Sequence, residues 1–251
     1  MRAILSFLLI LLLSVPPCEG ARAYSTTSNY TRVSSALVTA APLTMCCWFN
    51  LANTTAEHSL MGIFDVGGDV DYFMLLARGD VAGDPIAAVA RRSSQGIANS
   101  TAAYTANTWS HACGVFTSTT SRTVYLNGAN SATDTTSITP AGLDRTTVGM
   151  RDRATPTSMS GSIAEAAIWN VALDASEIAA LAKGFSPRLI RPASLVFYAP
   201  LTRNVIDLKG NAITDTSSQS SLDHPRVYFP MGQTRRMPAW MLAWASPAFL
   251  K

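Results

Sequence analysis

The chain has 251 residues, of which 48% are hydrophobic and 14% are charged, and its formal net charge is +3. This length and apolar content suffice for one substantial hydrophobic core, so we expect one domain with attached segments. The arginines occur in small groups, such as Arg91 with Arg92, without a basic stripe or interleaved aromatic residues. The composition therefore argues against nucleic acid as a partner.

Residues 1–23 have the layout of a secretory signal peptide. One positive charge at Arg2 precedes an apolar run over residues 3–15, two prolines follow, and a small-residue site ends at Ala23. We predict cleavage after Ala23 and a secreted or extracellular protein. The apolar run is too short to span a bilayer, so we expect no transmembrane span. The alternatives are lipoprotein processing at Cys18 and a start codon assigned upstream of a cytoplasmic protein.

From residue 24 to about residue 170, short strand-like runs alternate with clusters of Gly, Asn, Asp, Ser or Thr. The runs are rich in branched or aromatic residues, and they read "LTMCCWFN", "SLMGIFDV", "YFMLLAR", "PIAAVARR", "WSHACGVF", "RTVYLNG" and "RTTVGM". Asn127-Gly128 predicts a type I′ hairpin turn, because both central positions of that turn need positive φ. Many short strands with close turns predict an all-β fold, an antiparallel sandwich or barrel.

Three cysteines remain after the predicted cleavage: Cys46, Cys47 and Cys113. Adjacent residues of a strand point to opposite faces, so at most one of the first two can meet Cys113. We expect buried thiols that act as small hydrophobic groups, with a disulfide as the alternative. Cysteine spacing does not indicate a metal site, since no C-x-x-C occurs.

An acidic cluster lies in "DVGGDVDY", where Asp65, Asp69 and Asp71 surround Gly67-Gly68. Carboxylate oxygens are the ligands that Ca²⁺ prefers, so these three residues are the candidate metal site and calcium is the one candidate cofactor. The alternative is a solvated hairpin tip that uses Asp and Gly for turn geometry.

Residues 161–169, "GSIAEAAIW", predict a strand that Gly161 allows the chain to enter tightly. A period of two places Ile163, Glu165, Ala167 and Trp169 on one face. For Glu165 we expect a carboxylate that accepts hydrogen bonds at a sheet edge, with catalysis as the alternative.

One amphipathic helix is predicted near residues 175–183. Asp174 and Glu177 form an Asp-x-x-Glu variant of the capping box, and Lys183-Gly184 supply the C-terminal charge and cap. We expect this helix to pack over one end of the sandwich.

Several of these motifs, in this order, resemble the laminin-G-like, concanavalin A-like jelly rolls. "AYSTTSNYTRV" is similar to the family's first motif, "LTMCCWFN" to its strand ending in a core Trp, "NTWSHACGVF" to its Trp-x-His strand, "RTVYLNG" to its hairpin, and "GSIAEAAIWNVALDASEIAAL" to its closing strand and helix. The resemblance covers roughly residues 23–184 and implies a jelly-roll sandwich. Ala164 stands where the family usually has Asp, which puts a ligand role at that position in doubt.

The resemblance implies a non-catalytic recognition module whose partner is a glycan or cell-surface polysaccharide. Glucan hydrolases of this fold place an acid and a nucleophile on one strand as Glu-x-Asp-x-x-Glu, about 5 to 5.5 Å apart for retention. The chain contains no such motif, so we predict that it is not an enzyme and has no catalytic residues. The alternatives are a structural virion or tail-associated phage protein and, as a second alternative, a cryptic glycosidase.

The segment after the helix, "SLVFYAPLTRNVIDLKGNAITDTSSQSS", resembles a family strand that usually precedes the first strand. We interpret it as a circular permutation in which residues 194–229 complete a domain over 24–229; the alternative is a truncated second domain. Both faces of 194–199 are apolar, so we expect pairing with a strand of the 23–170 region near the first strand. The apolar tail, 230–251, predicts a surface for a protein partner, for a membrane interface or for docking on the domain itself.

Overall fold

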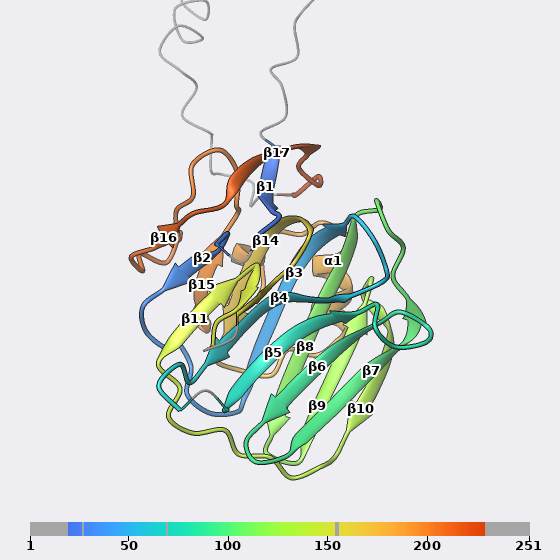
Figure 1. Ribbon diagram of the computed structural model, residues 1–251, viewed down its shortest axis with the longest axis vertical. Coiled ribbons are helices and arrows are strands. Elements are labelled where there is room, and N and C mark those ends of the chain that lie inside the picture. The colour runs from blue at the N-terminus through green and yellow to red at the C-terminus, as the bar shows by residue number, and fades with distance from the viewer. Residues whose placement is uncertain (1–19, 27, 69, 154–155, 229–251) are drawn as a thin grey trace, which may run out of the picture.

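The computed structural model describes residues 20–228 except for residues 27, 69, 154 and 155. Two antiparallel sheets are stacked face to face, and one α-helix lies outside the stack (Figure 1). This architecture confirms the predicted jelly-roll sandwich.

The first sheet has eight strands in the order β10-β9-β8-β3-β14-β1-β17, and β15 also pairs with β14. Its strands are β1 (Gly20–Tyr24), β3 (Leu43–Leu51), β8 (Ser110–Ser118), β9 (Ser121–Leu126), β10 (Ala129–Asp134), β14 (Gly161–Trp169), β15 (Leu195–Ala199) and β17 (Ser218–Asp223).

The second sheet has seven strands in the order β16-β2-β11-β4-β5-β6-β7, and β12 pairs with β13 as a separate two-stranded unit. The remaining elements are β2 (Thr31–Val33), β4 (Glu57–Phe64), β5 (Tyr72–Arg78), β6 (Pro85–Arg91), β7 (Gln95–Ala103), β11 (Arg145–Val148), β12 (Met150–Arg151), β13 (Thr157–Ser158), β16 (Thr214–Asp215), the helix α1 (Ala175–Ala182) and the 3-10 helix η1 (Pro187–Leu189).

Strand alternation builds two apolar layers on β3. Met45 and Phe49 belong to the core between the sheets, whereas Cys46 belongs to a second cluster outside the eight-stranded sheet. Ile178 and Leu181 of α1 cover that second cluster. The helix therefore shields the outer face of this sheet, behind β3 and β8 in Figure 1.

The N-terminal cap of α1 is the capping box that the sequence predicts. The Asp174 carboxylate accepts the backbone N–H groups of Ser176 and Glu177, each at 2.9 Å, and the Glu177 carboxylate accepts the N–H of Asp174 at 2.9 Å. The predicted hairpin turn is also present, with φ of 54° at Asn127 and 74° at Gly128. Both predictions are confirmed.

The predicted placement of Ile163, Glu165, Ala167 and Trp169 on one face of β14 is wrong, because the strand carries a bulge after its fourth residue, Ala164. The pairing with β3 shifts between Ala164 and Ala167, and Glu165 takes a φ of 55°. One extra residue reverses the alternation, since side-chain faces repeat every two residues. Ile163 therefore lies in the core between the sheets, whereas Ala167 and Trp169 pack beneath α1.

β15 is part of the eight-stranded sheet and does not stand apart. It pairs with β14 from Ala166 to Trp169, while β1 pairs with β14 from Gly161 to Ile163. The strand ends at Ala199, directly before Pro200, as expected for a residue without an N–H. The predicted pairing near the first strand is thus present.

β1 extends the domain into residues that the sequence assigned to the signal peptide. Gly20 and Ala21 are buried, and the predicted cleavage point after Ala23 falls inside this strand. The apolar run and the tail over 230–251 lie outside the described residues. Among the described residues, no helix has the length and apolar content needed to cross a membrane.

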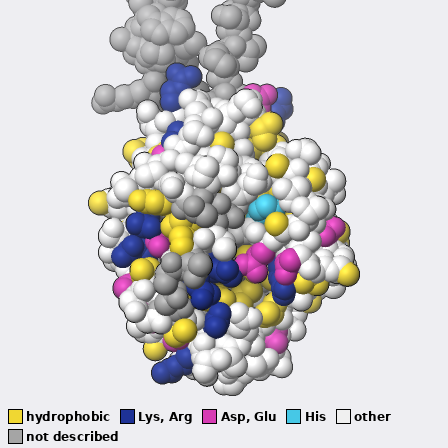
Figure 2. All heavy atoms as spheres, in the orientation of Figure 1, with side chains coloured by type: hydrophobic (Ala, Val, Ile, Leu, Met, Phe, Trp, Pro, Cys, Tyr) yellow, Lys and Arg dark blue, Asp and Glu magenta, His cyan; other side chains and the backbone are white. Residues whose placement is uncertain are grey.

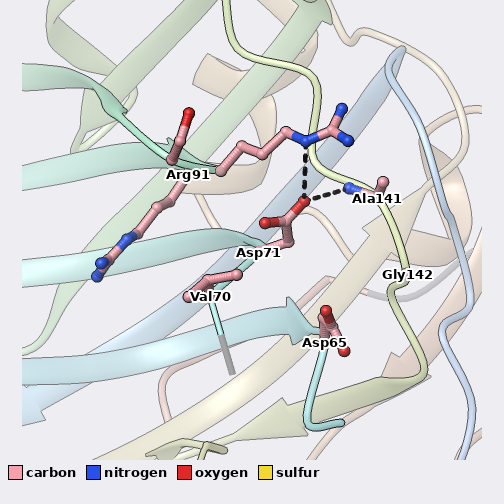
Figure 3. A pocket seen from close by; sticks show the side chains of 8 residues that line it. Asp65, Val70, Asp71, Arg91, Ala141 and Gly142 are labelled. Atoms are coloured by element: carbon pink, nitrogen blue, oxygen red, sulfur yellow. Dashed lines mark hydrogen bonds and ion pairs between the residues drawn. The ribbon is translucent and has the colours of Figure 1, made fainter. Parts of the chain in front are cut away.

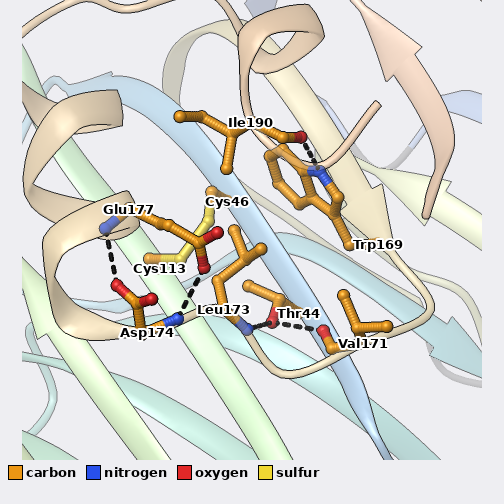
Figure 4. Close-up of a disulfide and its surroundings, with 9 residues drawn as sticks. All are labelled: Thr44, Cys46, Cys113, Trp169, Val171, Leu173, Asp174, Glu177 and Ile190. Carbon is orange, nitrogen blue, oxygen red and sulfur yellow. Dashed lines mark hydrogen bonds between the residues drawn. A yellow bond between two sulfur atoms is a disulfide. The ribbon is translucent and has the colours of Figure 1, made fainter. Parts of the chain in front are cut away.

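The expectation that the cysteines are free thiols is wrong for two of them. Cys46 and Cys113 form a disulfide between directly opposite positions of β3 and β8, beneath α1 (Figure 4). The register of the two strands, which the sequence does not specify, brings these residues together. Cys47 points into the core and stays a buried thiol, as expected.

Candidate functional site

A pocket of about 590 Å³ opens at one end of the seven-stranded sheet. Its walls come from the loop between β4 and β5, the end of β6, and the segment that precedes β11 (Figure 3). The residues that line it are Asp65, Val70, Asp71, Arg91, Arg92, Ser93, Ala141 and Gly142. We call this the rim pocket.

Asp71 fixes one wall of the rim pocket. Its side chain is buried, and its carboxylate accepts the backbone N–H of Ala141 at 2.7 Å. Arg92 lies near the same oxygen, with an Nε–Oδ2 distance of 3.8 Å, and its side chain is 57% exposed. Asp71 thus ties the segment before β11 to the start of β5, while the guanidinium stays accessible to solvent.

Asp65 directly follows β4, at the start of the turn that leads to β5. Its carboxylate accepts the N–H of Gly68 at 2.7 Å. A Cβ atom at Gly68 would lie 2.1 Å from Oδ2 of Asp65, so this turn has room for the carboxylate only because residue 68 is glycine.

A row of five cross-strand neighbours leads from the rim pocket over the outer face of the same sheet. The pairings join Arg145 on β11, Phe64 on β4, Tyr72 on β5, Arg91 on β6 and Gln95 on β7. We call these five residues the cross-strand row. Successive strands lie about 4.8 Å apart, so the row is an extended platform.

Side-chain contacts hold the aromatic centre of the cross-strand row in place. The rings of Phe64 and Tyr72 are 5.9 Å apart, and both belong to an apolar cluster separate from the core. Gln95 donates a hydrogen bond to the Tyr72 hydroxyl at 3.0 Å, and the Arg91 guanidinium lies 5.9 Å from the centre of the Tyr72 ring. Figure 2 shows charged and hydrophobic side chains close together on the face in front of β4 to β7.

Two of the three predicted calcium ligands, Asp65 and Asp71, line the rim pocket, and Asp69 lies outside the described residues. The described residues do not fit a calcium site well, because the Asp71 carboxylate already faces a guanidinium and an N–H. No group of three His, Cys, Asp or Glu side chains suited to a metal ion occurs in the described part of the chain. Calcium binding therefore stays a prediction.

Glu165 accepts hydrogen bonds as expected, although β14 lies inside the sheet and not at its edge. The bulge turns its carboxylate into a buried cluster, where the Tyr198 hydroxyl donates to Oε2 at 2.6 Å and His224 Nε2 lies 3.2 Å from Oε1. The Nε2 atom also faces the Pro200 carbonyl at 3.0 Å, and Nδ1 faces the Pro225 carbonyl at 2.7 Å. Only the protonated imidazole can donate from both nitrogens.

The environment raises the pKa values of His224 and Tyr198 and lowers that of a third buried group nearby, His111. Burial lowers the pKa of His224, but its contacts with Glu165 outweigh this effect, so the pKa is raised above its usual value. Burial and the neighbouring Glu165 charge raise the pKa of Tyr198. Burial alone lowers the pKa of His111 to about 3. His111 and Glu165 line the same small cavity of about 10 Å³.

We predict that His224→Gln destabilises the protein more at pH 6 than at pH 9. The unfolded histidine takes up a proton near pH 6.5, and the folded state takes it up at higher pH, so the stabilisation is complete below pH 6.5 and is lost as the pH rises through the raised pKa. Urea unfolding of both proteins at a series of pH values measures the difference.

His58→Gln is the matched control, because burial lowers the pKa of His58. Because the folded state keeps His58 neutral, the protein loses free energy of unfolding as the pH falls below 6.5. The pH dependence of the cost of His58→Gln is therefore opposite to that of His224→Gln. A cost of His224→Gln that is equal at both pH values would contradict the charged contact with Glu165.

Comparison with known protein families shows which family this chain belongs to. A family model described as "Concanavalin A-like lectin/glucanases superfamily" matches residues 25–179. The chain belongs to this superfamily. A search of curated proteins found no match.

Solved structures of the same fold include proteins of several functions. A heptameric SAP-like pentraxin from Limulus polyphemus is 14% identical, with a TM-score of 0.56 over 78% of this chain and 95% of that one. A putative carbohydrate-binding protein from Bacteroides ovatus is 16% identical, with a TM-score of 0.55 over 81% and 61%. Domain 4 of AbnA, an extracellular arabinanase from Geobacillus stearothermophilus in complex with arabinotriose, is 16% identical, with a TM-score of 0.53 over 64% and 76%. At these identities the likeness establishes the superfamily fold.

Sequence reasoning missed most of the site. It singled out the acidic residues of the rim pocket but gave no role to Arg91, Gln95 or Arg145, which come from three different strands. The adjacent pair Arg91 and Arg92 at the end of a strand was the one available signal. Its position beside Tyr72 follows from strand register, which the sequence alone does not specify.

Proposed function

We propose that the protein is a non-catalytic carbohydrate-binding module whose ligand lies in the rim pocket and along the cross-strand row. The observation that carries this proposal is an open pocket of about 590 Å³ that continues into a row of accessible polar side chains. In this row the exposed Gln95 and the half-buried Arg91 and Arg145 flank two buried aromatic residues. Small-molecule sites are concave and hold the ligand with a few placed polar groups, and the rim pocket and the polar side chains of the cross-strand row supply these two features.

The superfamily relationship supports the proposal. One protein of the same fold is described as a putative carbohydrate-binding protein, and another is a domain in complex with arabinotriose. The outer face of the eight-stranded sheet is a poorer candidate, because α1 covers part of it and its cavity holds only about 10 Å³. The virion or tail-protein alternative stays a prediction.

Binding of the full chain to a panel of soluble polysaccharides tests the function. We expect retardation in affinity electrophoresis by at least one polymer and no release of reducing ends from it. Gln95→Ala should weaken binding several-fold, since the exposed amide is lost from the cross-strand row. The same panel with EDTA or added Ca²⁺ tests the calcium prediction.

Gln219→Ala is the matched control, because Gln219 is an exposed glutamine on β17 of the opposite sheet. This variant should bind like the parent protein. If Gln219→Ala weakens binding and Gln95→Ala does not, the site is on the other sheet. If no polymer is bound, the proposed function is wrong.

A further inference from the structure

Three arginines on the binding face lack a close anionic partner. On this sheet and beside it, other arginines form short ion pairs: Arg32 with Asp152 at 2.7 Å, Arg78 with Asp80 at 2.9 Å, and Arg151 with Glu57 at 2.7 Å. Arg91, Arg92 and Arg145 have no ion pair shorter than 3.7 Å among the described residues.

The carboxylates nearest to Arg92 and Arg145 are already occupied. Asp71 Oδ2, 3.8 Å from Arg92, accepts the N–H of Ala141 at 2.7 Å. Asp152 Oδ2, 3.7 Å from Arg145, lies 2.7 Å from Arg32 and accepts the Thr147 hydroxyl at 3.0 Å. Each carboxylate therefore has closer donors, and the positive charge of Arg92 and Arg145 is only partly neutralised.

Arg91 has no ion-pair partner among the described residues. Its guanidinium carbon lies 5.9 Å from the centre of the Tyr72 ring. The guanidinium is half-buried at the boundary between the rim pocket and the cross-strand row. A planar cation on an aromatic ring keeps its N–H groups available to a ligand.

In backbone position, the three arginines follow one line across the sheet. Arg92 and Arg91 lie at the end of β6, and Arg145 lies in the same cross-strand row on β11, three strand spacings or roughly 14 Å away. A single small anion cannot contact both ends of such a line. An extended chain with several anionic groups can.

We propose that the ligand is an acidic polysaccharide whose carboxylate or sulfate groups pair with Arg91, Arg92 and Arg145. This inference rests on the proposed carbohydrate-binding function and names the ligand class of the same site. Guanidinium groups bind such oxyanions through two parallel N–H donors, which gives these contacts both strength and orientation.

Binding of the full chain to polygalacturonate and to its carboxyl-reduced form tests the inference, because the two polymers share a backbone and differ in charge. If the ligand carries carboxylates, we expect polygalacturonate to bind about tenfold or more tightly than its carboxyl-reduced form. If the ligand is sulfated, we expect the same difference between dextran sulfate and dextran. Arg91→Gln and Arg145→Gln should each weaken binding to the acidic polymer about tenfold, the loss expected for one charged hydrogen-bonded contact.

Arg78→Gln is the control, because it removes the same charge from the same sheet but breaks an existing pair with Asp80 at 2.9 Å. It should leave binding nearly unchanged. An equal loss in Arg78→Gln and Arg91→Gln would show general attraction by charge and overturn the assignment. A single-stranded oligonucleotide bound as tightly as the acidic polymer would overturn the ligand class.

Different results would contradict the acidic ligand and the carbohydrate-binding function. Equal binding of the acidic and neutral polymers would contradict the acidic ligand but not carbohydrate binding. If the protein binds neither of these polymers and no other polymer in the panel, the proposed function is wrong.

Discussion

A chain that ends at residue 193 is expected to aggregate and to show no cooperative thermal transition. The deletion removes β15, whose Leu195, Phe197 and Tyr198 are buried, and leaves one half of β14 without its partner. Burial of each such side chain contributes about 2 kcal/mol, so three of them approach the total stability of a typical domain, about 5–15 kcal/mol. The open apolar edge then pairs with other chains.

Deletion of residues 231–251 alone is the control for this truncation. It leaves every described strand in place, so the soluble yield and the melting temperature should stay near those of the full chain. Sedimentation of the two truncated proteins, together with circular dichroism during heating, separates the outcomes. If the chain ending at residue 193 is soluble and melts cooperatively, β15 is not required for the sandwich.

Loss of the disulfide is expected to lower the free energy of unfolding by about 4 kcal/mol. Cys46 and Cys113 are 67 residues apart, and a cross-link over a loop of this length restricts the unfolded chain by about that amount. The double variant Cys46→Ala with Cys113→Ala should therefore unfold at lower urea concentration than the parent protein. Unfolding of both proteins with and without dithiothreitol measures the effect.

Cys47→Ala is the control, because Cys47 is a buried thiol that forms no bridge. This variant loses some core packing but should still be destabilised further by dithiothreitol, whereas the double variant should not respond to it. If dithiothreitol leaves the parent protein unchanged, the disulfide does not form in solution.

Most of the sandwich could be predicted because its inner strands carry the pattern that burial imposes. Runs such as β3 and β5 contain branched or aromatic residues on both faces, and the sequence predicts both as strands. β7 and β17, in contrast, are rich in Ser, Asn, Gln and Ala and have mostly exposed or half-buried residues. Their strand structure comes from hydrogen bonding to a neighbouring strand, and local propensity does not report it.

The errors have a common physical cause, which is register. The bulge at Glu165, the bridge between Cys46 and Cys113, and the cross-strand row each depend on which residue lies opposite which. A shift of one residue reverses every face, and no single strand contains the information that sets it. The candidate acidic residues could be found because they are close in sequence, whereas the arginines of the platform are not.

The position of β1 sets the order in which the sheet can form. This strand is made first, yet its two neighbours are β14 and β17, which are made late. Contacts between residues so far apart in the chain form only after a long loop closes, and such closure slows folding. Arg22 and Ala23 therefore stay without their partners on β17 until residues 218 and 219 have been synthesised and have left the ribosome.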